Sequence, residues 1–88
     1  MNKRLEVRVE FQRWLEVTGL PEGSYTNKTD GYLLDEQGGS RFRWRITYKE
    51  GNGESTSQFG EQRLSTEEMY EALRLAVNTV WAMKRKEQ

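Results

Sequence analysis

The chain has 88 residues, enough for one domain (residues 1–88) with a single modest core. Its 14 basic and 14 acidic residues cancel, so no net charge draws the protein to nucleic acid or to anionic membranes. Cysteine and histidine are both absent from the sequence, which excludes disulfides, thiolate nucleophiles, histidine-based triads and histidine- or cysteine-ligated zinc. We therefore expect a non-enzymatic protein with no catalytic residues, no cofactor and no metal site.

Residues 3–18 are compatible with a helix or with a strand. The odd-numbered positions are mostly apolar, as in a half-buried strand. The same segment also carries an apolar stripe at helical spacing, made of Val7, Phe11, Trp14 and Leu15. Gly19 suits the left-handed residue that ends a helix, and Pro21 prevents its continuation. We favour a helix that ends near Thr18, with an additional strand as the alternative.

The middle of the chain predicts a loop followed by three strands. Residues 22–30 are rich in Gly, Ser, Thr, Asn and Asp and are typical of a loop. Strands are expected at 31–35, 41–49 and 54–60, joined by glycine-containing hairpin turns at 36–40 and 50–53. This pattern predicts a three-stranded antiparallel meander.

The central strand, 41–49, alternates apolar and polar residues without a fault. Its even positions are Phe42, Trp44, Ile46 and Tyr48. Its odd positions include four cations, the cationic stripe: Arg41, Arg43, Arg45 and Lys49. Successive side chains of a strand leave opposite faces, so one face is expected to be apolar and the other cationic. The cationic stripe is the candidate site for binding carboxylates or phosphates. The alternative is that these side chains are solvated and paired with carboxylates across the sheet.

The last element, 65–86, has the clearest helix signals in the chain. Ser65 and Glu68 form a capping box, and Leu64 and Met69 are placed as a hydrophobic staple. An apolar stripe follows at helical spacing: Met69, Leu73, Ala76, Val77, Val80 and Trp81. The basic residues 84–86 suit the negative end of the helix dipole. We expect this long helix to cover the apolar face of the central strand.

Part of the chain resembles DNA-binding modules that place a three-stranded sheet against a helix. These are the arm-binding domains of phage integrases and the plant ethylene-response-factor domain. The similar features are Phe42-Arg-Trp-Arg-Ile, the Gly51-Asn-Gly turn, Phe59-Gly60 and Ser65-Thr-Glu-Glu. The resemblance implies that the basic face of the sheet enters the major groove and contacts bases or phosphates through Arg41, Arg43, Arg45 and Lys49. The order helix, three strands, helix is also similar to double-stranded-RNA-binding domains, but acidic residues open the last helix where that family has lysines.

A neutral, cysteine-free chain of this size with short strands and one long helix also resembles the small accessory proteins of phages. That group includes anti-CRISPR proteins and an early inhibitor of host dGTPase. The likeness to the inhibitor is confined to Arg43, Arg45, Ile46, Gly51, Asn52, Thr56, Ser57 and Phe59. The resemblance implies a stoichiometric binder that blocks a host or defence protein in the host cytoplasm.

Together these patterns predict an α+β domain, a three-stranded meander packed against a long C-terminal helix with the N-terminal segment alongside. We expect an inhibitor or adaptor that acts through protein contacts, in which Arg41, Arg43, Arg45 and Lys49 pair with an acidic partner. The alternative is a DNA-binding domain that uses the same residues. Because the sequence has no apolar run of about 18 residues and no apolar signal region, we expect a cytoplasmic protein, either a monomer or a homodimer.

Overall fold

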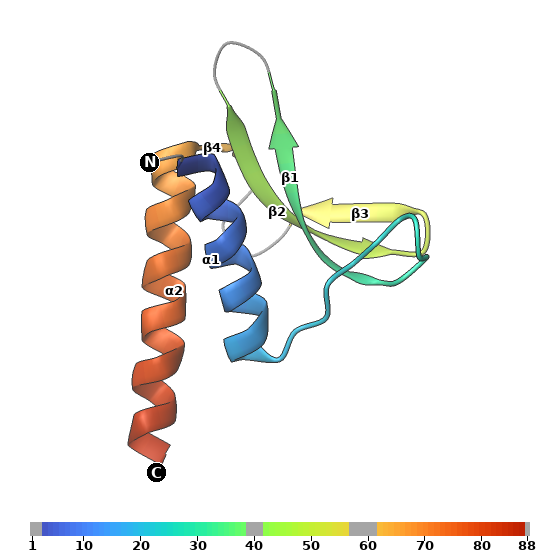
Figure 1. Cartoon of the computed structure of the whole chain (residues 1–88). Coiled ribbons are helices and arrows are strands. Elements are labelled where there is room, and N and C mark those ends of the chain that lie inside the picture. The colour runs from blue at the N-terminus through green and yellow to red at the C-terminus, as the bar shows by residue number, and fades with distance from the viewer. Residues whose placement is uncertain (1–2, 39–41, 57–61, 88) are drawn as a thin grey trace.

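The protein has an α+β fold in the computed structural model, which describes residues 3–38, 42–56 and 62–87 (Figure 1). In chain order its elements are α1 (Lys3–Thr18), β1 (Gly31–Gln37), β2 (Arg43–Glu50), β3 (Gly53–Thr56), β4 (Leu64–Ser65) and α2 (Thr66–Glu87). The predicted order of helices and strands is confirmed, and the N-terminal segment is a helix. The sheet also contains β4, which the sequence did not predict.

Strand β2 is the centre of the sheet. β1 pairs with it antiparallel from Arg43 to Lys49 and so occupies one whole edge. β3 pairs with residues 47–50 and β4 with residues 43–44, so these two short strands lie one after the other along the opposite edge. Gly51, with φ of +61°, makes the turn between β2 and β3. The turn predicted at 36–40 begins later, because Glu36 and Gln37 still pair with β2. The rest of that turn from residue 39, Arg41 of the predicted central strand, and the end of the third predicted strand, with Phe59, lie outside the described residues.

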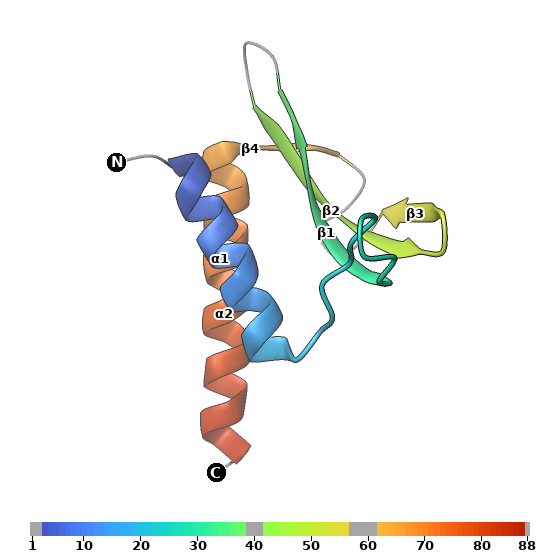
Figure 2. The same ribbon diagram turned by 45° about the vertical axis from the view of Figure 1, so that its right-hand side comes forward.

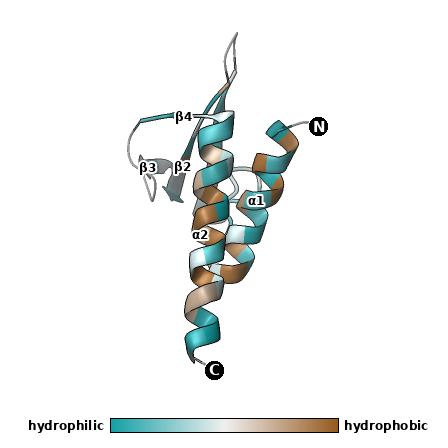
Figure 3. Ribbon diagram, turned by 90° about the vertical axis from the view of Figure 1, so that its left-hand side faces the viewer, coloured by the Kyte–Doolittle hydropathy of each residue, from teal (hydrophilic) through white to brown (hydrophobic). Residues whose placement is uncertain are grey.

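The two helices lie side by side and run in the same direction (Figures 1 and 2). Their first turns are adjacent, because the Lys3 Nζ atom lies 4.1 Å from the centre of the Tyr70 ring. α2 is longer and continues past the end of α1 (Figure 2). Figure 3 shows hydrophobic residues along both helices and a hydrophilic C-terminal end on α2. Among the described residues, the C-terminal end of α2 therefore extends beyond α1 (Figure 2).

The predicted helix ends are confirmed at atomic detail. Gly19 has φ of +71°, and its N–H donates to the Leu15 carbonyl at 2.9 Å. At the start of α2 the N–H of Ser65 donates to Glu68 Oε1 at 2.9 Å, and the N–H of Glu68 donates to Ser65 Oγ at 3.2 Å. This reciprocal pair is the predicted capping box, and it fixes where α2 begins.

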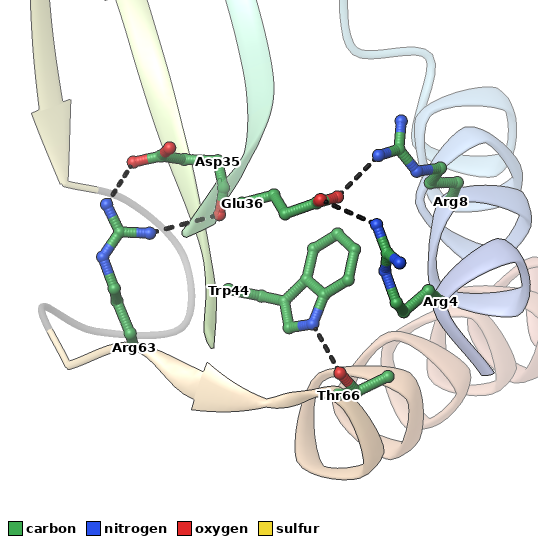
Figure 4. A network of polar contacts seen from close by, with 7 residues as sticks. All are labelled: Arg4, Arg8, Asp35, Glu36, Trp44, Arg63 and Thr66. Atoms are coloured by element: carbon green, nitrogen blue, oxygen red, sulfur yellow. Dashed lines mark hydrogen bonds and ion pairs between the residues drawn. The ribbon is translucent and has the colours of Figure 1, made fainter. Parts of the chain in front are cut away.

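The core forms where both helices meet β2. Its buried members are Val7, Phe11, Trp14, Leu15, Trp44, Ile46, Met69, Leu73 and Val77. Trp44 is fully buried, and its indole Nε1–H donates to Thr66 Oγ1 at 2.9 Å (Figure 4). The indole therefore joins β2 to the first residue of α2 while its ring fills the space between the layers. The apolar face of β2 is thus covered by α1 and α2 together.

A row of aromatic rings extends this packing toward the end of α1. Tyr32 and Tyr48 face each other across β1 and β2 with ring centres 5.0 Å apart. Trp14 meets Tyr32 edge to face at 5.4 Å. The even-numbered side chains of β2 therefore stay on the helix side of the sheet throughout.

The segment that connects α1 to β1 passes very close to β1. The N–H of Gly23 donates to the Tyr32 carbonyl, and the N–H of Tyr32 donates to the Pro21 carbonyl, both at 2.9 Å. A Cβ atom on Gly31 would lie 2.6 Å from the carbonyl oxygen of Pro21 and 2.7 Å from the backbone nitrogen of Gly23. Only glycine fits at position 31, because these neighbours are backbone atoms that cannot move independently.

We predict that Gly31→Ala lowers the free energy of unfolding by roughly 3 kcal/mol, the upper range for overpacking a tight site. The matched control is Gly38→Ala, where an added Cβ meets nothing within 4 Å and the effect should stay within about 1 kcal/mol. Urea denaturation followed by tryptophan fluorescence measures both. Equal stability of the two variants would contradict the close approach at Gly31.

Candidate functional site

The cationic stripe is divided by the structure into two environments. Arg43 and Arg45 lie in the first half of β2 and are half-buried. Lys49 lies near its end and is buried, and Arg41 is outside the described residues. The sequence expectation of one continuous open cationic face therefore applies only to the first half of β2.

Lys49 is held inside the protein by the loop that precedes β1. Only 4% of its side chain is exposed, and its Nζ atom lies 3.3 Å from Asp30 Oδ1. The same ammonium group lies 5.2 Å from the centre of the Tyr25 ring. Lys49 thus stabilises the loop against β2 and has little surface to offer an outside partner.

Asp30 ties three segments together. Besides Lys49, its Oδ1 atom accepts a hydrogen bond from the N–H of Gly51, at 2.9 Å, in the turn between β2 and β3. The Gly51 N–H, and after it the Lys49 ammonium, hold the pKa of the Asp30 carboxyl below its usual range. The carboxylate form of Asp30 is therefore the form that the fold favours.

Asp35 gathers two arginines on the other half of the same face. Its Oδ2 atom accepts hydrogen bonds from Arg45 Nε at 3.2 Å and from Arg63 Nη2 at 2.7 Å, and Arg63 also donates to the Asp35 carbonyl at 3.4 Å. Figure 4 shows Arg63 reaching Asp35 from the segment before β4. Two guanidinium groups share one carboxylate, so this area keeps a surplus of positive charge.

Arg43 extends this area toward α2. By strand alternation it lies on the same face as Arg45. The pKa of Glu68 is held below its usual range first by the N–H and hydroxyl of Ser65, and to a smaller extent by the charge of Arg43. We refer to Arg43, Arg45 and Arg63 as the arginine cluster. The sequence did not indicate Arg63, because only the pairing of β4 with β2 brings it near the stripe.

Glu36 performs the corresponding role on the opposite face of β1. It accepts hydrogen bonds from Arg4 Nη2 at 3.2 Å and from Arg8 Nη2 at 2.6 Å, both from α1 (Figure 4). The Arg4 guanidinium also stacks over the Phe42 ring at 3.7 Å. Two neighbouring carboxylates on β1 therefore bind arginines on opposite faces of the sheet. Glu36 binds the arginines of α1 on the helix side, and Asp35 binds Arg45 and Arg63 on the outer side.

A groove of about 570 Å³ lies between α1 and β1. It is lined by Arg8, Phe11, Gln12, Glu22, Leu33, Leu34, Glu36 and Trp44. Its polar groups already bond across it, with Arg8 to Glu36 at 2.6 Å and Gln12 Nε2 to Glu22 Oε2 at 2.9 Å. These bonds hold α1 to the sheet side of the groove, and its apolar floor belongs largely to the core.

Exposed apolar side chains gather on α2. Leu75 is 70% exposed, Trp81 42% and Met83 60%. Trp81 and Met83 lie in the last two turns of α2, next to the exposed basic residues 84–86. The sequence assigned Trp81 to the core stripe, but the last buried core residue of α2 is Val77, and 42% of Trp81 is exposed. Trp81 and Met83 are two residues apart and so lie on nearly opposite sides of α2, whereas Lys84 and Arg85 lie within one turn of Trp81 on its side. The end of α2 thus presents Trp81 with a cationic border.

Comparisons of the chain with protein-family models, with curated proteins and with solved structures give no match. Within residues 3–38, 42–56 and 62–87, no group of three or more His, Cys, Asp or Glu side chains is placed to hold a metal ion. Neither helix, over its described length, is long and apolar enough to cross a membrane. Two surfaces remain as candidate sites, the arginine cluster and the end of α2.

We predict that Asp30→Asn removes part of the acid sensitivity of folding. A carboxyl whose pKa is lowered in the folded state contributes stability above its unfolded pKa, near 4, and loses it as the pH falls through the folded value. Unfolding free energies measured between pH 3 and pH 7 should therefore converge for the variant and the parent protein at low pH and diverge at neutral pH. A constant difference across this range would show that Asp30 does not act through its charge.

Proposed function

We propose that this protein is a non-enzymatic binder, of the phage inhibitor or adaptor type, that blocks another protein by stoichiometric contact. The observation that supports the proposal best is the exposure of Trp81 and Met83 at the end of α2. Large apolar side chains in water are costly to solubility, and Trp in particular is a common anchor of protein interfaces. The proposal places the docking surface there.

The chemistry of this surface favours a partner of a definite kind. Trp81 is the anchor of this surface, and Val80 beside it is half-buried. Lys84 and Arg85 border them and are exposed. An apolar pocket with a carboxylate rim would complement both parts, since interfaces combine a desolvated centre with a polar border.

The arginine cluster adds to this proposal from the other side of the fold. Arg43 and Arg45 are half-buried, and the charge around them exceeds what Asp35 neutralises. They retain the role expected from the sequence, ion pairs with an acidic partner, while Lys49 is withdrawn into the fold. Such border charges act mainly on association rate and specificity.

The alternative function is DNA binding through the arginine cluster. The observation that favours it is the approach of Arg45 and Arg63 to one carboxylate, with Arg43 on the same face, so that guanidinium charge outnumbers the carboxylate of Asp35. Arginine forks bind phosphates in a bidentate manner. The zero net charge of the chain favours the protein partner over this alternative.

We predict that the double variant Trp81→Ala, Lys84→Glu loses its partner when the tagged protein is purified from its host. Truncation of an interface anchor costs about 2 kcal/mol, or roughly 30-fold in affinity. The matched control is Val9→Ala, an exposed apolar residue on α1, which should retain the partner. A partner that stays bound to the double variant, or the absence of any partner at low salt, would refute the proposed docking surface.

We predict no DNA mobility shift at 50 mM salt. The alternative function requires one, together with an affinity that falls roughly 40-fold between 50 and 200 mM salt for three phosphate contacts. It also requires Arg45→Ala to reduce the slope of log affinity against log salt concentration by about 1, the loss of one phosphate contact. A salt-dependent shift that weakens in Arg45→Ala would replace the protein-partner proposal with the DNA-binding one.

A further inference from the structure

The side of α2 that faces away from the core carries a second regular pattern. Glu71, Leu75, Asn78, Ala82 and Arg85 are spaced by four, three, four and three residues, and all five are exposed. This is the spacing that brings one face of a helix against another helix. We refer to these five residues as the outer face. Leu75, at its centre, is more exposed than any other large hydrophobic residue described by the structure.

The outer face lies beside the surface assigned to the protein partner and shares Arg85 with it. At about 100° per residue, Leu75 lies half a turn from the buried Leu73 and also half a turn from Lys84. Trp81 is about 120° away from it. Leu75 is therefore outside the Trp81 surface, whereas an occupant that pairs with Arg85 would also approach Trp81, four residues earlier.

The charges along α2 are complementary to a reversed copy of themselves. Glu67, Glu68 and Glu71 lie in its first turns, and Lys84, Arg85 and Lys86 lie in its last turns. Two copies in parallel would place like charges together, which costs free energy. Two antiparallel copies would place the acidic end of each beside the basic end of the other.

The size of the residues suits close contact between such copies. Ala82 and Asn78 are small enough to leave room for a leucine from a facing helix, and 22 residues give a helix of about 33 Å. A two-fold axis near residues 76 and 77 would place Leu75 of each copy opposite Asn78 of the other. The same register would set Glu67 and Glu71 near Arg85 and Lys86.

We propose that two copies of this protein associate antiparallel through the outer face of α2, with Leu75 at the centre and Glu67–Glu71 paired with Arg85–Lys86 at each end. The interface is isologous, because each copy contributes the same surface. It extends beyond the proposed function, and Leu75→Glu tests it without altering Trp81, Lys84 or Arg85.

The test is the molar mass of the full chain by sedimentation equilibrium at 50 mM salt, from about 1 µM to 1 mM. The mass should rise from 10.4 kDa toward twice that value as concentration increases. Leu75→Glu should weaken the dimer at least about 10-fold. Its matched control is Leu5→Glu, a similarly exposed leucine on α1, which should dimerise as the parent protein does.

Reversing the charges at the two ends of α2 shows whether they act between two copies or only on the dipole of their own helix. Glu67→Lys with Glu71→Lys should weaken the dimer, as should Arg85→Glu with Lys86→Glu. All four changes together should restore it. If these charges serve only the helix dipole, the fourfold variant should be the least stable of the three and monomeric.

Three results would overturn the proposal. One is a parent protein whose molar mass remains at 10.4 kDa up to 1 mM. The outer face would then not bind a second copy, and a different protein could cover Leu75. Another is a dimer that persists in Leu75→Glu. The last is a fourfold variant that stays monomeric while circular dichroism shows it folded.

Discussion

The alternation of side chains along β2 is the constraint on which the rest of the structure depends. Because neighbours on a strand face opposite ways, burial of Trp44 and Ile46 under the helices sends Arg43, Arg45 and Lys49 to the other face. The apolar side chains of β2 are covered by two helices, α1 and α2, instead of the single helix expected from the sequence. On the other face, Arg45 pairs with Asp35 of β1, and Lys49 pairs with Asp30 in the loop before β1.

The ion pairs differ in what they contribute. Pairs such as Arg8 with Glu36 are partly exposed, and each is worth at most about 1 kcal/mol, so they mainly set the angle between α1 and the sheet. The pair of Lys49 with Asp30 is different, since the ammonium is almost wholly buried and would be left without its carboxylate if Asp30 were lost. The loop before β1 therefore contributes to the stability of the sheet through Asp30, although its own residues 25–30 are exposed.

Local signals in the sequence predicted the helices, the capping box, the turn at Gly51 and the apolar face of β2. Each of these features depends on residues that are close together in the sequence. The fourth strand could not be predicted, because β4 has two residues and no periodicity. Burial of Lys49 and the position of Arg63 depend on contacts between distant segments, which a strand pattern does not contain. The same limit hid the exposure of Trp81, whose stripe predicted a core residue.

The end of β2 therefore serves folding, and the proposed binding surface lies at the end of α2. The most direct test compares the unfolding free energies, in urea, of Lys49→Ala and Lys84→Ala, the same change at a buried and at an exposed lysine. We expect a loss of more than about 1 kcal/mol for Lys49→Ala and a change within about 0.5 kcal/mol for Lys84→Ala. A neutral Lys49→Ala, or a Lys84→Ala that destabilises the protein as much, would contradict this expectation.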